Sequence, residues 1–108
     1  MDKEIKESIK KIADTYGYDA QSRQCIEEMA ELTKAINKFW RKILMCGKRD
    51  VVKYDDTLLF SEEQNNIVEE MADVQIMLWQ LEYLLNADTS IIIQQKLDRQ
   101  IQRIEDKN

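Results

Sequence analysis

The chain has 108 residues, a length that fits one domain with a small hydrophobic core. It contains no proline and only two glycines, which argues against an all-β fold, and its abundant Glu, Lys, Ile, Leu, Gln and Ala favour helices. The net charge of −5 argues against a protein that binds a nucleic-acid backbone. Histidine is absent, which excludes Ser-His and Cys-His catalytic systems and histidine-ligated zinc, so a metal would need oxygen ligands.

The sequence predicts neither a secretory signal nor a membrane span. Residues 1–4 lack the apolar core of a signal peptide, and the chain has no apolar run of the length that a spanning helix needs. Cys25 and Cys46 lie in predicted helices and are interpreted as reduced cysteines. We therefore expect a cytoplasmic protein with no membrane partner.

The first half of the chain predicts two helices. Apolar residues at helical spacing indicate a helix from about Lys3 to Tyr16, and we expect Gly17 to end it. A second helix is expected to begin near Asp19 or Ser22, either of which can cap it. It continues to about residue 45, just before the second glycine.

The second half predicts two more helices after a long connection over residues 48–60. Ser61 opens a capping-box pattern, and the third helix is expected to reach about Asn86. Because residues 67–85 are apolar nearly all round, we expect this helix to be buried on most sides. Asp88 or Thr89 is expected to cap a fourth helix of about 17 residues.

A short repeat, Glu-Glu-Met-Ala, occurs at residues 27–30 and again at 69–72. Each copy belongs to a pair of carboxylates three residues apart, Glu28 with Glu31 and Glu70 with Asp73. Side chains at this spacing are neighbours on a helix, so each pair can present two carboxylates to one point in space.

The leading carboxylate of each pair falls on an apolar stripe. At about 100° per residue, Glu28 shares a stripe with apolar residues further along its helix, and so does Glu70. The two stripes contain Leu32, Ala35 and Phe39, and Val74, Met77 and Leu81, respectively. Carboxylates turned toward a core need compensation, and a hard divalent cation such as Mg²⁺ favours oxygen ligands. The spacing therefore predicts a metal site that faces a phosphate-bearing ligand.

These motifs carry a resemblance to a known family. Residues 27–32, Glu-Glu-Met-Ala-Glu-Leu, followed by residues 69–74, Glu-Glu-Met-Ala-Asp-Val, resemble the signature Glu-Glu-x-x-Glu, spacer, Glu-x-x-Asp of the MazG-like all-α NTP pyrophosphohydrolases. The resemblance covers about residues 17–103, within a single domain over 1–108. The spacer is longer than in the tightest versions of the pattern, and its extra length falls in residues 48–60.

The resemblance implies a fold and an activity. The fold is all-α and four-helix-bundle-like, with helices that pair across the interface of a homodimer or homotetramer. The activity is hydrolysis of a nucleoside or deoxynucleoside triphosphate to the monophosphate and pyrophosphate, by attack of water at the α-phosphorus. Mg²⁺, with Mn²⁺ as a possible substitute, would be held by Glu28, Glu31, Glu70 and Asp73. Glu31 or Glu27 would orient or deprotonate the water.

Basic and aromatic residues are the candidates for contacts with the nucleotide. Lys96, Arg99 and Arg103 share one face of the fourth helix, where the resembling family also places basic residues. Asn37 is a candidate for contact with a base edge, and an aromatic wall for the base has three candidates, Phe39, Trp40 and Trp79. Three basic residues of the long connection, Lys48, Arg49 and Lys53, are further candidates for contact with a ligand.

Two other functions stay open at the level of sequence. A non-catalytic helical interaction module or regulatory dimer explains an apolar third helix, but it does not explain acidic residues on apolar stripes. A carboxylate-only protein that binds metal without catalysis explains those residues as well. An EF-hand is excluded, because Asp55-Asp56-Thr57 has the wrong spacing for its calcium loop.

Overall fold

A computed structural model of the protein describes residues 1–44 and 62–107. These residues form three α-helices and a short π-helix, with no strand among them: α1 (Lys3–Phe39), η1 (Trp40–Leu44), α2 (Glu62–Leu84) and α3 (Ser90–Lys107). The described part of the chain is thus all-helical, as predicted. The capping box at Ser61 and the connection 48–60, with its three basic candidates, lie outside the described residues.

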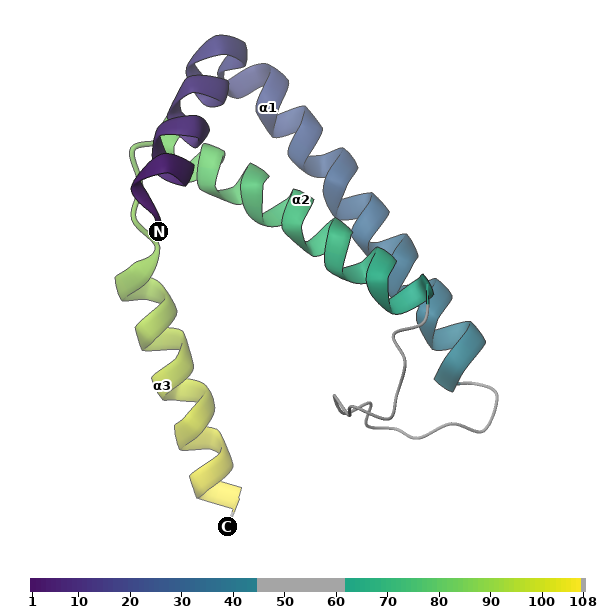
Figure 1. The fold of residues 1–108 in the computed structure, drawn as a ribbon. Coiled ribbons are helices and arrows are strands. Elements are labelled where there is room, and N and C mark those ends of the chain that lie inside the picture. The colour runs from purple at the N-terminus through teal and green to yellow at the C-terminus, as the bar shows by residue number, and fades with distance from the viewer. Residues whose placement is uncertain (45–61, 108) are drawn as a thin grey trace.

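Helices α1 and α2 run antiparallel and side by side, whereas α3 leaves the end of α2 and stands apart (Figure 1). Within the described residues, α3 packs against neither α1 nor α2. An ion pair between Lys42 and Glu63, at 3.0 Å, joins η1 to the first turn of α2. The hydrogen bond from Lys42 lowers the pKa of the Glu63 carboxyl. None of the described helices is both long and apolar enough to span a membrane.

Gly17 divides α1 into two straight segments. Its φ of 83° and ψ of 170° are not helical, and this left-handed φ is one that glycine adopts without strain. The predicted break at this residue is therefore confirmed. The predicted caps at Asp19 and Ser22 are wrong, because both residues already lie inside the second segment of α1, where the Ser22 hydroxyl donates to the Asp19 carbonyl at 3.0 Å.

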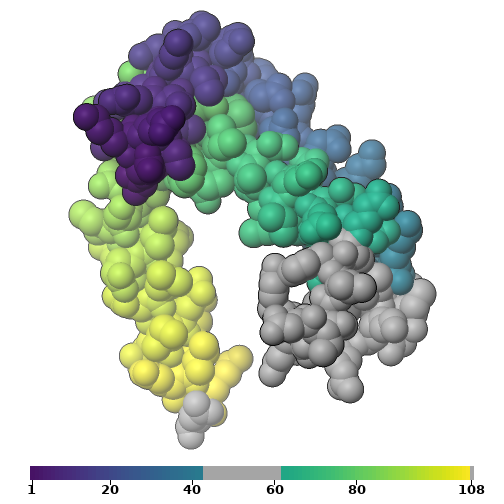
Figure 2. All heavy atoms as spheres, in the orientation of Figure 1, coloured from purple at the N-terminus to yellow at the C-terminus, as the bar shows by residue number. Residues whose placement is uncertain are grey.

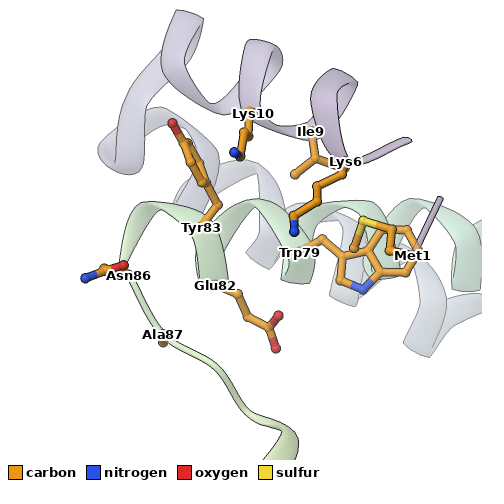
Figure 3. Close-up of a pocket in the computed structure, with 9 residues that line it drawn as sticks. All are labelled: Met1, Lys6, Ile9, Lys10, Trp79, Glu82, Tyr83, Asn86 and Ala87. Carbon is orange, nitrogen blue, oxygen red and sulfur yellow. The ribbon is translucent and has the colours of Figure 1, made fainter. Parts of the chain in front are cut away.

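The first segment of α1 folds back onto the end of α2. The Tyr83 hydroxyl donates to the Asp14 carboxylate, 2.8 Å from Oδ1 and 3.0 Å from Oδ2, and this hydrogen bond raises the pKa of Tyr83. The Lys10 ammonium lies 5.9 Å from the centroid of the Tyr83 ring. Figure 3 shows Lys10 and Tyr83 among the residues that line a surface pocket between the two helices.

Helix α2 ends in two backbone hydrogen bonds around Asn86, which has a left-handed φ of 51°. The Asn86 N–H donates to the Tyr83 carbonyl and the Ala87 N–H donates to the Glu82 carbonyl, the pattern of a Schellman motif. Asn tolerates this conformation better than most residues. Two residues later the Asp88 carboxylate accepts a hydrogen bond from the Ser90 N–H at 2.9 Å, so Asp88 caps α3 as predicted.

The core is small and lies between the two segments of α1 and one face of α2. Among the described residues, five apolar ones are buried: Ile9, Ala13, Cys25, Val74 and Met77. The prediction that residues 67–85 are buried on most sides is wrong for the single chain, because Met71 is 54 % and Leu78 is 42 % exposed. One neighbouring helix covers only one side of α2, and no other described element of the chain packs on the side that carries these two residues.

Two glutamines pair across the contact surface between α1 and α2, which we call the seam. Gln21 and Gln80 are buried, and the Gln21 side-chain amide donates to the Gln80 carbonyl oxygen at 2.8 Å. The Gln80 amide in turn lies 3.7 Å from the Met77 sulfur, a weak acceptor. This buried pair is satisfied only when α1 and α2 have the observed register, so it favours that register over a slipped one.

The Gln80→Leu variant is expected to lose about 1–3 kcal/mol of unfolding free energy, because it leaves the buried Gln21 amide without its acceptor. The double variant Gln21→Leu/Gln80→Leu is expected to recover most of that loss, since no polar group is then left unpaired. Urea unfolding of the wild type, both single variants and the double variant measures the coupling. Additive effects of the two substitutions would contradict the proposed role of the hydrogen bond.

Candidate metal centre

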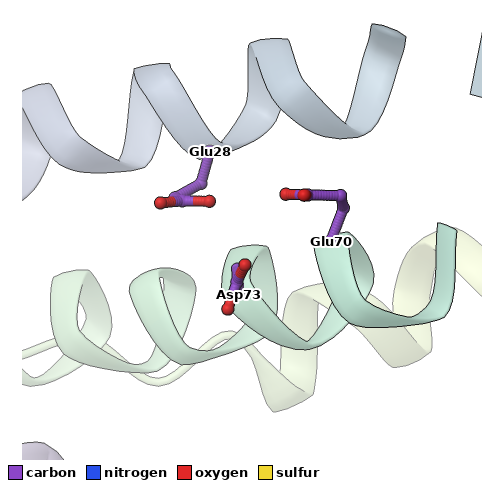
Figure 4. A group of neighbouring side chains, drawn as sticks. All are labelled: Glu28, Glu70 and Asp73. Carbon is purple, nitrogen blue, oxygen red and sulfur yellow. The ribbon is translucent and has the colours of Figure 1, made fainter. Parts of the chain in front are cut away.

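Three carboxylates meet where the middle of α1 faces the first half of α2. Glu28 comes from α1, and Glu70 and Asp73 come from α2 (Figure 4). One carboxylate oxygen from each residue lies within 4.8 Å of the other two. Two helices far apart in sequence thus direct three acidic groups to one point, and these are three of the four carboxylates that the two half-motifs predict there.

The helical stripes explain why these side chains point inward. Val74 and Met77, which share a stripe with Glu70, are buried against α1, so the α2 stripe is confirmed. Glu28 and Glu70 are both partly buried in the seam, whereas Asp73 at the edge of the group is exposed. The group is therefore accessible from one side and enclosed by the helices on the other.

Glu70 is the member of the group whose negative charge is least well balanced by neighbouring groups. Its Oε2 atom is the one buried side-chain oxygen or nitrogen, among the described residues, that has no hydrogen-bond partner. Burial raises the pKa of the Glu70 carboxyl, and the nearby charges of Asp73, Glu28, Glu31 and Glu69 raise it further. Such a group either takes up a proton or requires a cation.

Gln24 orients the carboxylate that faces Glu70. It lies one turn before Glu28 on α1, and its side-chain amide donates to Glu28 Oε1 at 2.8 Å. This bond holds one oxygen of Glu28 and leaves the other available to a ligand, which is how outer residues commonly support a metal ligand. Sequence reasoning missed Gln24, although its i, i+4 spacing from Glu28 is a signal that could have found it.

The donor set fits a hard divalent cation. The three groups supply only carboxylate oxygens, the ligands that Mg²⁺ and Mn²⁺ prefer. A cation at this point would also give the buried Glu70 Oε2 a partner and offset the repulsion among the three carboxylates. The exposure of Asp73 leaves room for water or phosphate oxygens, which Mg²⁺ retains among its ligands.

The other predicted carboxylates lie beside this group. Glu31 is exposed on α1 and is not one of the three clustered residues, but its charge is close enough to raise the pKa of Glu70. Glu27 is exposed as well, and Glu69, which precedes Glu70, adds a further negative charge. Glu31 and Glu27 are thus both exposed on α1, and of the two it is Glu31 whose charge acts on the three-carboxylate group.

The residues predicted to contact the nucleotide are not brought to the carboxylates within one chain. Asn37 is exposed on α1, and Trp40, at the start of η1, is 52 % exposed; both lie more than two helical turns beyond Glu28. The basic row is exposed on the separate helix α3 and consists of Lys96, Arg99 and Arg103. Since α3 packs on neither α1 nor α2, it supplies no cation to the site of its own chain.

The pocket at the other end of the hairpin is separate from the carboxylate group. It has a volume of about 250 Å³ and lies between the first segment of α1 and the end of α2 (Figure 3). Trp79, predicted as a wall for the base, lines this pocket together with Lys6 and Lys10. None of the three clustered carboxylates contributes to its lining, so Trp79 lies outside the candidate metal centre.

Comparison with known proteins assigns no family. No protein-family model matches the chain, and no curated protein and no solved structure matches it either. The functional assignment consequently depends on the chemistry of the carboxylate group and on the sequence motif that forms it.

Proposed function

We propose that this chain is a Mg²⁺-dependent pyrophosphohydrolase of nucleoside or deoxynucleoside triphosphates. The observation that carries the proposal is the buried Glu70 Oε2 atom, which lacks a partner inside a group of three carboxylates from two helices. A site of this kind either takes up a proton or holds a cation, and an oxygen-ligated Mg²⁺ is the usual companion of a triphosphate in enzymes. The doubled motif that forms the site resembles that of a family with this activity.

In the proposed site the protein supplies charge and orientation. Glu28, Glu70 and Asp73 hold the cation, Glu31 completes the set from the solvent side, and Gln24 keeps Glu28 in place. Bound Mg²⁺ would supply the positive charge that offsets the phosphate oxygens. The four carboxylates thereby create a binding position for a ligand that would otherwise be repelled by their negative charge.

The proposed reaction needs a base at the exposed edge of the site. Glu31, or Glu27 one turn earlier, accepts a proton from a water molecule that attacks the α-phosphorus. A bond from the water oxygen to phosphorus forms, the bond from phosphorus to the bridging oxygen breaks, and pyrophosphate leaves. Glu31 is the stronger candidate, because its charge already acts on Glu70.

Cations for the phosphates are proposed to come from a second chain in a homodimer or homotetramer. The exposed basic row of α3 (Lys96, Arg99 and Arg103) is too separate from α1 and α2 to serve its own site. Asn37 and Trp40 are proposed to contact the base from the end of α1 that follows the carboxylates. We propose a cytoplasmic location for this assembly.

A metal-binding protein without catalysis is the second candidate function. The same three carboxylates and the same unpartnered Glu70 oxygen support it, because both observations call for a cation and neither requires a reaction. The two functions differ in turnover alone, so a kinetic assay separates them.

The purified chain is expected to release pyrophosphate from at least one member of a panel of ribo- and deoxyribonucleoside triphosphates when Mg²⁺ is present. Chelation of the metal by EDTA is expected to stop the release, and Mn²⁺ is expected to restore it. Pyrophosphate and nucleoside monophosphate are measured in parallel and should appear in equal amounts. Metal binding without turnover of any nucleotide would favour the non-catalytic metal-binding protein, and the absence of both would contradict the metal site itself.

A further inference from the structure

The pocket between the first segment of α1 and the end of α2 combines aromatic rings with positive charge. Trp79 and Tyr83 supply the rings from α2, and Lys6 and Lys10 supply two ammonium groups from α1 (Figure 3). The apolar part of the lining comes from Met1, Ile9 and Ala87. Apolar and aromatic surface with a few charged groups is the usual composition of a small-molecule site. This composition suits a ligand that has both a flat ring and a negative charge.

The two lysines of the pocket have no carboxylate partner. They are four residues apart, so their side chains are neighbours on α1 and their like charges repel. No ion pair joins either lysine to a carboxylate of the described residues, although the chain as a whole has a net charge of −5. Lys10 lies over the Tyr83 ring instead. An anion between the two ammonium groups would offset their repulsion, so the pocket favours a negatively charged group.

The walls of the pocket are held in place by contacts within the chain. The Tyr83 hydroxyl donates to the Asp14 carboxylate, which restricts the position of the ring. Ile9 is 6 % exposed, so an apolar contact anchors the first segment of α1 beside the pocket. Trp79 is partly buried, which restricts its ring as well. Because these walls are already ordered, a ligand loses less free energy to the ordering of side chains when it binds.

Glu82 gives the pocket a hydrogen-bond acceptor. Its carboxylate is partly buried in the lining, and the Thr89 hydroxyl donates to its Oε1 atom. This bond holds one oxygen of Glu82 and leaves the other able to accept from a ligand. A carboxylate attracts an N–H donor and repels an anion. The pocket therefore favours a ligand with a ring N–H near Glu82 and with its negative group near the lysines.

The pocket and the three clustered carboxylates lie on different sides of α2. Trp79 comes nine residues after Glu70, which at about 100° per residue places the two on opposite sides of the helix. Figure 2 shows the first segment of α1 (purple) against the last turns of α2 (green), with α3 projecting away from both. A ligand in the pocket therefore does not occupy the position of a cation held by the carboxylates.

We propose that this pocket is a second ligand site, separate from the metal centre, and that it binds a small aromatic anion. The ring packs against Trp79 and Tyr83, the phosphate or carboxylate of the ligand lies between Lys6 and Lys10, and Glu82 accepts a hydrogen bond from a ring N–H or amino group. The pocket volume of about 250 Å³ is below the roughly 300–1,000 Å³ of sites that enclose drug-sized ligands, so it suits one ring with its charged group at the rim.

Two classes of compound share this chemistry, nucleoside monophosphates and amino-substituted aromatic acids. The experiment titrates AMP, UMP and 4-aminobenzoate into the full chain in EDTA and follows the tryptophan indole N–H signals by NMR. The chain has two tryptophans, and the Trp40→Phe variant identifies the signal of Trp79. At least one of the three compounds is expected to shift the Trp79 signal in a saturable manner and to leave the Trp40 signal in place. Because no metal is present, the result does not depend on the proposed hydrolysis.

Benzoate, which lacks an N–H donor, and inorganic phosphate, which lacks a ring, are the ligand controls. Each is expected to bind at least about 10-fold more weakly than the best of the three compounds, the effect of one missing contact to a charged group. A shift caused by a nucleoside monophosphate identifies the ligand class as a nucleotide, and a shift caused by 4-aminobenzoate alone identifies it as an aromatic acid. Both results support the proposal.

Lys10→Glu is expected to weaken binding by at least about 10-fold, because it replaces a cation of the pocket with an anion. Lys11→Glu is the matched control: it makes the same charge change at the next residue, which is exposed and does not line the pocket. Its effect is expected to stay within about twofold. Far-UV circular dichroism of both variants measures their helical content.

Four results would overturn the proposal. The first is a Trp79 signal that does not move with any of the three compounds up to about 10 mM, a concentration that occupies even a weak site. The second is equally tight binding of benzoate or inorganic phosphate. The third is a helical Lys10→Glu variant that binds as the wild type does, and the fourth is an equal loss of binding in Lys11→Glu.

Discussion

Asp73→Ala is expected to reduce Mg²⁺-dependent pyrophosphate release by at least about 100-fold while the helical circular-dichroism signal stays close to that of the wild type. Removal of a residue that merely supports a metal ligand lowers metal affinity or activity about 10–100-fold. We expect a larger loss for Asp73, because its proposed role is direct ligation. The substitution is expected to change the free energy of unfolding little, because the Asp73 side chain is exposed and is not part of the buried core. Initial rates at saturating nucleotide and metal measure the effect.

Glu31→Ala is expected to lose turnover as well, but to bind metal better than Asp73→Ala does. Glu31 lies outside the three clustered carboxylates, so its removal leaves the groups that face one another across the seam. Isothermal titration with Mn²⁺ alone separates binding from catalysis in both variants. Glu7→Ala removes an exposed carboxylate from the first segment of α1 and is the matched control. Full activity in both Glu31→Ala and Asp73→Ala would eliminate the site assignment.

Mg²⁺ is expected to raise the melting temperature strongly at neutral pH and progressively less as the pH falls. The pKa of Glu70 is raised in the folded chain by burial and by its acidic neighbours, so ionised Glu70 destabilises the metal-free fold. The stabilisation from neutral Glu70 is fully present below its unfolded pKa of about 4.3 and is lost as the pH rises through the higher folded pKa. Metal binding opposes that loss at neutral pH, whereas protonation at low pH prevents binding.

The size of the metal effect follows from mass action. A metal concentration of about 100 times the dissociation constant stabilises the fold by about 2.7 kcal/mol, which raises the melting temperature of a domain of this size by about 10 °C or more. The Glu70→Gln variant is expected to melt higher than the metal-free wild type at neutral pH and to show little response to Mg²⁺. Glu105→Gln, on α3, is the control for loss of a carboxylate. A metal response that Glu70→Gln retains in full would contradict ligation by Glu70.

Local features of the helices could be predicted because neighbouring residues determine them. The break at Gly17 follows from the conformational freedom of glycine, and the start of α3 follows from the cap by Asp88. The placement of Glu70 on a stripe with Val74 and Met77 follows from helical periodicity, and the burial of those two residues agrees with it. The caps at Asp19 and Ser22 failed because the second segment of α1 begins directly after Gly17, which left both residues inside the helix.

Features that depend on which helices meet could not be predicted from one sequence. Periodicity shows that α2 is apolar on several sides, but it does not show that one chain covers only one of them and leaves Met71 and Leu78 exposed. The same limit applies to the basic row of Lys96, Arg99 and Arg103. Helical spacing predicts that these residues share a face, but it does not predict that α3 lies apart from the other helices. Contacts between distant segments depend on crossing geometry, which no local pattern encodes.

By itself, the sequence determined that Glu28 and Glu70 each occupy an inward stripe of a helix, because an α-helix repeats every 3.6 residues whatever surrounds it. Only the tertiary structure decided that the two stripes meet, that Asp73 joins them while Glu31 stays at the edge, and that Glu70 Oε2 is left without a partner. The register of α1 on α2, favoured by the buried Gln21–Gln80 hydrogen bond, determines those distances. Register is a property of the packed pair, since neither helix alone specifies where the other begins.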